Sequence, residues 1–399
     1  STIYNESDKL YYTFYTGHSV RPDVTGLGEG IMFATSSDFK TWDKNQLFLL
    51  RGKDYGYSNS DFRDPFVFKG DDGLYHMLVS TKKGNKGVLA EFVSKDLNSW
   101  ECIGDFMNMM WDRFYECPDL FKMGDWWYLI YSEKHAALRK VQYFKGRTLE
   151  ELKSTTANDV GIWPDNHEGF LDSRGFYAGK TASDGTNRYI WGWCPTRPGN
   201  DNVNVGAYPN EPEWAGNLVV HRVIQHEDGT LTLGEVKGIS DKYNKETKIK
   251  IVGGSDESSL SGGSYTLFNR LEEHSKISFV ITTRGNYDKF GVSFVRGSDS
   301  EKYYSIIVNP ENENNRKINF VEEGQSGKGF VDGIDGYVFQ RPIDNVYHIT
   351  IYTDNSTCVV YINDVCCYTN RIYGIQKNCW SINCYEGDIV IDDLKVFVD

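Results

Sequence analysis

The chain has 399 residues, more than one ordinary hydrophobic core holds, so two domains are expected. Its formal net charge of -13 argues against nucleic acid as a partner, because phosphate backbones are bound by clustered lysine and arginine. No stretch approaches the roughly 20 apolar residues of a membrane helix, so no membrane partner is expected either.

Aromatic residues make up 15% of the chain, and 39 glycines accompany them. This mixture is typical of strands joined by tight turns and favours an all-β protein. The eight cysteines form no CxxC pair and no Cys/His spacing of a zinc site, so neither a metal centre nor another cofactor is expected. Five cysteines follow Thr357, which leaves a disulfide open, but buried free thiols are the favoured interpretation.

Two repeated elements run through the first part of the chain. Residues 36–42 (SSDFKTW) and 94–100 (SKDLNSW) share the form Ser-x-Asp-(Phe/Leu)-x-x-Trp. An aromatic strand recurs at residues 10–15, 74–79, 127–131 and 189–193. Recurrence roughly every 50 to 65 residues predicts a β-propeller, in which each blade buries its faces only against its neighbours. Divergent repeats within one large sandwich are the alternative.

The two domains are predicted to meet near residue 240, in a charged connection at residues 237–250. Strands with alternating apolar and polar residues resume beyond it, for example at residues 276–281 (KISFVI) and 347–352 (YHITIY). Turn-rich stretches separate these strands, a pattern typical of a β-sandwich. We therefore expect the propeller with the active-site cavity over residues 1–240 and the sandwich over residues 241–399.

Two carboxylates occupy neighbouring positions of successive repeats. Residues 63–70 (RDPFVFKG) precede the second aromatic strand, residues 116–124 (ECPDLFKMG) precede the third, and the prolines of the two motifs align. Asp64 and Glu116 therefore open the first strands of successive blades, where strands converge on the propeller axis. Two carboxylates facing one cavity are what a glycosidase needs. A strand-entry turn and a solvated loop are the structural alternatives for the two motifs.

The paired motifs resemble those of glycoside hydrolase family 32, which contains invertases, levanases and inulinases. The resemblance also covers residues 34–42, 172–181, 191–193, 228–231 and 346–364. It implies an all-β fold, a five-bladed β-propeller followed by a β-sandwich. It also implies retaining cleavage of fructosyl linkages in sucrose or fructans, with a fructose-containing oligo- or polysaccharide as partner.

The resemblance assigns roles to individual residues. Glu116 is expected to be the general acid/base, and Asp64 to stabilise the transition state through fructosyl hydroxyls. Arg63 is expected to bind the same ring. Asp119 orients Arg63 or holds a sugar hydroxyl, with capping of a turn as the alternative.

Two tryptophans, Trp42 and Trp191, are also expected to bind substrate, and packing between blades is the alternative for such residues. The nucleophile of the family lies in an Asn-Asp-Pro-like motif, which this sequence lacks. Alignment of the repeats sets Ser1 opposite Pro65, so the missing Asp would directly precede Ser1. Either residues have been lost upstream or this homologue has no nucleophile, and Ser1 is expected beside Asp64 and Glu116.

Two other functions follow from these observations. A catalytically inert fructan- or glycan-binding homologue would keep the cavity without the nucleophile. A five-bladed arabinosidase or xylosidase would also use central carboxylates, but the Glu-Cys-Pro-Asp motif counts against it.

Overall fold

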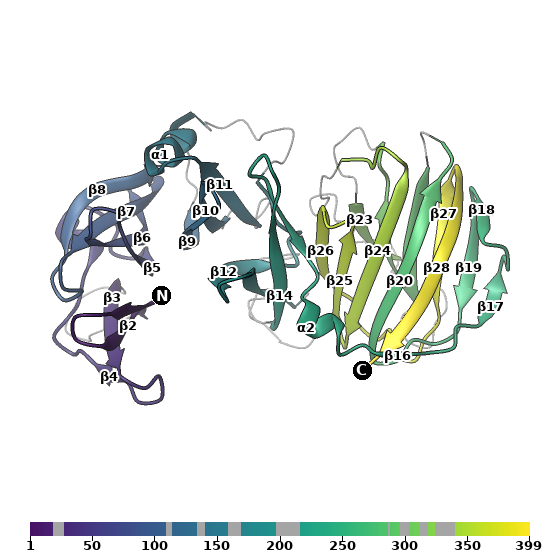
Figure 1. The fold of residues 1–399 in the computed structure, drawn as a ribbon, viewed down its shortest axis with the longest axis horizontal. Helices are drawn as coiled ribbons and strands as arrows, with labels where there is room; N and C mark the ends of the chain where they lie inside the picture. Colours follow the sequence, from purple (N-terminus) through teal and green to yellow (C-terminus); the bar gives the residue numbers. More distant parts are fainter. Residues whose placement is uncertain are drawn as a thin grey trace. The chain divides into compact units, whose positions relative to one another are not determined.

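The computed structural model describes residues 1–18, 28–108, 114–133, 140–158, 169–196, 216–285, 288–295, 303–311, 318–323 and 340–399. Within these residues the chain is almost entirely β-structure (Figure 1). The helical elements are η1 (Gly52–Tyr55), α1 (Leu149–Asn158) and α2 (Lys237–Ser240). Among the described residues, no helix is long and apolar enough to span a membrane.

Four small antiparallel sheets come first, and in each the strands neighbour one another in chain order. The first sheet contains β1 (Thr2–Asn5), β2 (Leu10–His18), β3 (Glu29–Ser36) and β4 (Asp43–Lys44). The second contains β5 (Phe62–Lys69), β6 (Tyr75–Lys83), β7 (Lys86–Ser94) and β8 (Glu101–Asn108). The third contains β9 (Tyr115–Met123), β10 (Trp126–Glu133) and β11 (Val141–Gly146). The fourth contains β12 (Tyr177–Ser183), β13 (Arg188–Pro195), β14 (Gly216–Gln225) and β15 (Leu231–Gly234).

These sheets explain the sequence repeats. The four copies of the aromatic strand lie in β2, β6, β10 and β13, the second strand of each sheet. The Ser-x-Asp element is a turn: Ser36 Oγ accepts the backbone N–H groups two and three residues on, and Asp38 Oδ1 does the same. Ser94 and Asp96 repeat these contacts. In the first and second sheets this turn follows the third strand, which explains the spacing of its two copies.

Two larger sheets form the β-sandwich. One sheet has the order β16 (Lys245–Glu246), β28 (Asp388–Val398), β20 (His274–Thr283), β24 (Val346–Asp354), β25 (Thr357–Ile362) and β26 (Cys366–Arg371), and β18 (Ser259–Ser261) also pairs with β28. The other has the order β17 (Ile251–Gly254), β19 (Ser264–Phe268), β27 (Trp380–Glu386), β21 (Lys289–Val295), β22 (Tyr303–Val308) and β23 (Ile318–Glu323).

The sandwich core follows from the alternation in these strands. Every second residue of β20 is buried, including Ile277 and Phe279, and these side chains share one hydrophobic cluster with Phe294 and Trp380 of the other sheet. All eight cysteines are free thiols, five of them buried, so the interpretation as free thiols is confirmed. The predicted all-β class, a propeller followed by a sandwich, is confirmed as well. Four of the five predicted blades are present as sheets in the described part of the chain.

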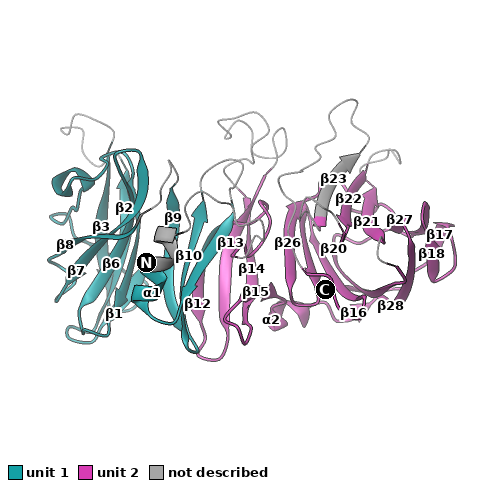
Figure 2. Ribbon diagram, turned by 90° about the horizontal axis from the view of Figure 1, so that it is seen from above, with its two compact units in different colours: residues 1–162, 178–180 teal, residues 163–177, 181–399 magenta. Residues whose placement is uncertain are grey.

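The chain forms two compact units (Figure 2). The first contains residues 1–162 and 178–180, and the second contains residues 163–177 and 181–399. The second unit thus holds the sandwich together with most of the fourth small sheet. Helix α2 lies between the last strand of that sheet and the first strand of the sandwich. The domain boundary near residue 240 stays a prediction.

Candidate functional site

A shared backbone distortion positions the two motifs. Asp64 in β5 and Cys117 in β9 both have left-handed backbones, with φ of 57° and 53°, and Ala178 in β12 has the same conformation at 56°. The pairing of β5 with β6, and of β9 with β10, shifts register at this point. Such a bulge re-aims the adjacent side chains. Arg63 and Glu116 therefore occupy equivalent positions, and Asp64 lies one position further on, as the alignment of the repeats predicts.

The guanidinium of Arg63 is the centre of a charged cluster. Its Nη1 atom donates to Glu29 Oε2 at 2.8 Å and to Asp61 Oδ1 at 3.0 Å, and its Nη2 atom donates to Glu116 Oε1 at 3.1 Å. The planar group also lies 4.2 Å from the centroid of the Phe114 ring. Burial acts to lower the pKa of Arg63, because it disfavours the charged form. The contacts with these carboxylates have a larger effect and raise the pKa of Arg63 above its usual value. Three charge-assisted contacts fix the guanidinium in one orientation.

Asp64 is anchored by backbone contacts. Its Oδ2 atom accepts the Cys117 N–H at 2.9 Å, and its own N–H donates to Thr16 Oγ1 at 3.0 Å. Burial raises the pKa of the Asp64 carboxyl and the charge of Glu116 adds to this, while the Cys117 N–H and the Arg63 cation act in the opposite direction. Asp64 therefore keeps its proton to a higher pH than an ordinary aspartate does.

A second cation, Lys180, completes this region. Its ammonium group donates to the carbonyl oxygen of Pro118 at 2.7 Å and lies 4.8 Å from the centroid of the Phe66 ring. The charge of Lys180 also lowers the pKa of Asp64. Lys180 lies two residues beyond Ala178, as Asp119 lies two residues beyond Cys117. Extending the alignment of the motifs to the fourth blade would have found it.

Ser1 lies beside the first motif. Its amino nitrogen donates to the carbonyl oxygen of Pro65 at 3.1 Å, and its Oγ atom accepts the Val67 N–H at 2.8 Å. Because Pro65 directly follows Asp64, this is the placement that the repeat register predicts.

Several acidic groups meet two cations here. Arg63 is in contact with Glu29, Asp61 and Glu116. The charges of Arg63 and Lys180 both act to lower the pKa of Asp64. Among these four carboxyl groups, Asp64 has a pKa that burial and the charge of Glu116 raise. The arrangement therefore places a carboxyl of raised pKa beside a second carboxyl group, and acid/base chemistry on a neutral ligand uses such a pair.

Sequence reasoning missed Glu29. Asp119 is buried on β9, but the carboxylates that hold the guanidinium of Arg63 are those of Glu29, Asp61 and Glu116. Glu29 opens β3, and its Oε2 atom also accepts the N–H of Phe62 at 2.9 Å. No local motif marks Glu29, because its contact with Arg63 joins strands of two different sheets.

The two predicted tryptophans belong to the first and the fourth small sheet. Trp42 directly precedes β4, the last strand of the first sheet, and its ring centroid lies 5.6 Å from that of Phe39. Trp191 lies in β13 of the second unit, with its ring centroid 6.0 Å from that of Tyr189. A substrate contact for either residue stays a prediction.

Both parts of the chain match known domain families. The glycosyl hydrolases family 32 N-terminal domain matches residues 1–234, and the GH32, BT1760-like, C-terminal domain matches residues 229–396. The chain belongs to glycoside hydrolase family 32. The resemblance drawn from the Arg-Asp-Pro and Glu-Cys-Pro-Asp motifs is thereby confirmed.

Individual family 32 proteins are similar to this chain at low identity. An insoluble isoenzyme of β-fructofuranosidase from Arabidopsis thaliana is 30% identical over 204 residues, 46% of this chain and 33% of that protein. Sucrose-6-phosphate hydrolase from Staphylococcus xylosus is 27% identical over 256 residues, 61% of this chain and 48% of that protein. The chain thus spans between a third and a half of the length of these relatives.

Solved family 32 structures share the fold. Fructan 1-exohydrolase IIa from Cichorium intybus superimposes with a TM-score of 0.73 at 15% identity, over 98% of this chain and 81% of that one. Sucrose-6-phosphate hydrolase from Lactobacillus gasseri gives a TM-score of 0.69 at 18% identity, over 100% of this chain and 77% of that one.

Proposed function

We propose that this chain takes part in the retaining hydrolysis of fructosyl linkages in sucrose or fructans. The observation that carries the proposal is the 3.1 Å contact between Arg63 and Glu116, which holds one carboxylate beside Asp64 on two neighbouring bulged strands. The similarity of this chain to β-fructofuranosidase and sucrose-6-phosphate hydrolase supports a fructoside as the substrate.

In the proposed reaction Glu116 acts twice. It first gives a proton to the glycosidic oxygen as the bond to the anomeric carbon breaks, and it then takes a proton from the water that releases fructose. Asp64 accepts hydrogen bonds from fructosyl hydroxyls, and these bonds strengthen as positive charge develops on the ring. Arg63 fixes Glu116 and contacts the same ring, while Asp119 holds a sugar hydroxyl.

Retention also requires a nucleophile, which is a third carboxylate in this chemistry. The family motif that carries it is absent from the printed sequence. The reaction is therefore tested with the chain as printed and with the chain extended by any residues that its gene encodes before Ser1.

The first experiment measures fructose released from sucrose, inulin and levan. We expect the extended chain to release fructose from at least one of them. If fructan binds to the extended chain and no fructose appears, the glycan-binding alternative replaces the proposal.

The second experiment isolates the acid role of Glu116. Glu116→Gln should lower the rate on natural fructosides by about 10²- to 10⁴-fold and should largely spare fructosides with activated leaving groups, since these depart without a proton. Glu6→Gln, at an exposed position of the same unit, is the matched control. An equal loss on both substrate classes would count against an acid role.

A further inference from the structure

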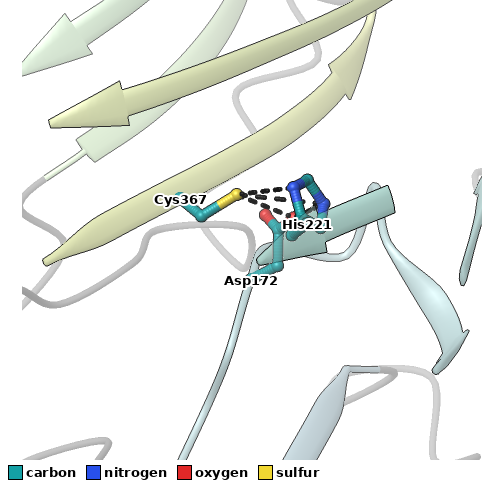
Figure 3. Close-up of side chains that lie close together, drawn as sticks. All are labelled: Asp172, His221 and Cys367. Carbon is teal, nitrogen blue, oxygen red and sulfur yellow. Dashed lines mark hydrogen bonds and ion pairs between the residues drawn. The ribbon is translucent and has the colours of Figure 1, made fainter. Parts of the chain in front are cut away.

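The second compact unit contains a polar cluster that the fructoside chemistry does not use. Asp172 precedes β12, His221 lies in β14, and Cys367 lies in β26, and all three side chains are completely buried (Figure 3). The His221 Nε2 atom lies 3.3 Å from Asp172 Oδ2, and Cys367 Sγ lies 3.4 Å from the same oxygen. The distance from Cys367 Sγ to His221 Nε2 is 3.9 Å.

These three distances suit the edges of a metal tetrahedron. Zinc binds sulfur at about 2.3 Å and nitrogen or oxygen at about 2.0 to 2.2 Å, so two ligands at the tetrahedral angle lie about 3.3 to 3.6 Å apart. The edges that involve Asp172 fall in this range, and the third exceeds it by only a few tenths of an ångström. An ion placed among the three atoms would reach all of them with small side-chain shifts.

Outer hydrogen bonds hold the carboxylate of Asp172 and the imidazole of His221 in place. Asp172 Oδ1 accepts the N–H groups of Ser173 and Thr369 at 2.6 and 2.7 Å, and Oδ2 accepts the Thr369 hydroxyl at 2.5 Å while it also faces His221 and Cys367. The Nδ1 atom of His221 lies 2.7 Å from the Tyr361 hydroxyl and 3.5 Å from Cys367 Sγ, and the Nε2 atom faces Asp172 Oδ2. Metal-binding carboxylates and imidazoles are oriented in this way by outer hydrogen bonds.

The donor set and its burial favour a borderline-soft cation. A buried carboxylate needs positive charge nearby, and the ion pair that Asp172 makes in the described part of the chain is with His221. One thiolate, one imidazole and one carboxylate suit zinc, whereas magnesium and calcium prefer oxygen ligands alone. Three protein ligands leave the fourth position to a water, because the nearby Thr369 hydroxyl donates to Asp172 Oδ2 at 2.5 Å, which is too close for two ligands of one zinc ion.

We infer that Asp172, His221 and Cys367 bind one zinc ion. The ion joins the segment before β12 and the strand β14 to the sandwich strand β26, and it closes a loop between residues that are 195 positions apart. Binding to such a site requires the folded arrangement, so it couples directly to folding. No sequence motif marks the site, because neither the spacing nor the order of the three residues follows a zinc motif.

Zinc content after refolding tests the inference directly. The full chain is refolded with zinc, freed of loosely held metal and analysed for zinc and protein. We expect about one zinc per chain in the wild type and in Cys366→Ala, and less than about a tenth of this in Cys367→Ala. Cys366 is the matched control because it is equally buried but points into the sandwich core on the opposite face of β26.

Cobalt substitution of the wild type keeps the test decisive if Cys367→Ala does not fold. Co²⁺ bound by a thiolate gives a sulfur-to-cobalt charge-transfer absorption in the near ultraviolet, and we expect this band in the wild type and in Cys366→Ala. Absence of the band, a zinc-free wild type, or equal zinc in Cys367→Ala would overturn the inference. The three residues would then form a hydrogen-bonded cluster without metal.

Discussion

Arg63 and Glu116 occupy equivalent positions of two neighbouring bulged strands, and the guanidinium of Arg63 donates to Glu116 Oε1 at 3.1 Å. The same guanidinium is held by Glu29 at 2.8 Å. The orientation of the proposed acid therefore depends on a residue that lies on a third strand, in the preceding sheet.

Glu29→Gln should weaken this arrangement without changing its shape. The amide retains one acceptor oxygen but loses the charge that strengthens the contacts with Arg63 and the Phe62 N–H, which costs about 1 to 3 kcal/mol of stability. We also expect kcat on fructosides to fall by about tenfold with a smaller change in KM, since Arg63 then holds Glu116 less firmly. Urea unfolding and steady-state kinetics measure the two effects.

The control for this prediction is Glu6→Gln, which changes an exposed glutamate of the same unit. It should match the wild type in both measurements. If Glu29→Gln also matches the wild type, Arg63 is held well enough by Asp61 and Glu116 alone, and the positioning role of Glu29 is wrong.

Asp64→Asn should stabilise the protein at neutral pH. Burial and the charge of Glu116 raise the pKa of Asp64 in the folded state, so the folded chain binds its proton more tightly than the unfolded chain. Stability is then lost as the pH rises from the ordinary aspartate pKa through the raised one. An asparagine does not ionise and avoids this loss.

The free energy of unfolding, measured as a function of pH, tests whether stability is lost as Asp64 ionises. The stability advantage of Asp64→Asn should be near zero at low pH and grow as the pH rises toward neutrality, while fructoside cleavage is lost. An advantage that is constant with pH would show that the effect has nothing to do with ionisation of Asp64.

The repeats could be predicted because they are local. The Ser-x-Asp turn and the aromatic strand each lie within a few residues of sequence, and the aligned prolines fixed the register of Asp64 and Glu116. No local sequence pattern indicates contacts between segments that are far apart in the chain. Glu29 reaches Arg63 across two sheets, and Asp172, His221 and Cys367 meet only after the sandwich has formed.

Trp42 shows that a repeated residue can have a purely structural role. Its motif recurs because it follows the turn after the third strand of a blade, and that structural reason is enough to explain the repeat. A recurring tryptophan therefore carries less information about a sugar site than a carboxylate at the start of an inner strand.

Ala178→Gly should be neutral or stabilising by up to about 1 kcal/mol. Ala178 has φ of 56°, a conformation that glycine adopts without the steric cost that a Cβ atom brings, although glycine loses more entropy on folding. Ala90→Gly is the contrast, because Ala90 is fully buried in β7 and its replacement removes packing. Thermal unfolding compares the two, and an equal loss of stability in both would contradict the strain argument.

Lys180→Met should move the acidic limb of the pH profile to higher pH. The ammonium group of Lys180 lowers the pKa of Asp64, so its removal lets Asp64 keep its proton to a higher pH. Methionine retains an apolar stem of similar length against the Phe66 ring, where the ammonium group lies 4.8 Å from the centroid. If ionised Asp64 is needed to accept hydrogen bonds from fructosyl hydroxyls, kcat/KM declines as the pH is lowered. This decline must begin at a higher pH in the variant than in the wild type.

Lys83→Met is the matched control for this shift. Lys83 also lies over an aromatic ring, that of Tyr57, and pairs with an aspartate, Asp105, but neither is part of the Arg63 cluster. Its pH profile should coincide with that of the wild type. A ¹³C NMR titration of the Asp64 carboxyl reports the same shift without relying on turnover. A limb that stays in place or moves to lower pH in Lys180→Met, with the carboxyl titration unchanged, would show that Lys180 does not set the ionisation of Asp64.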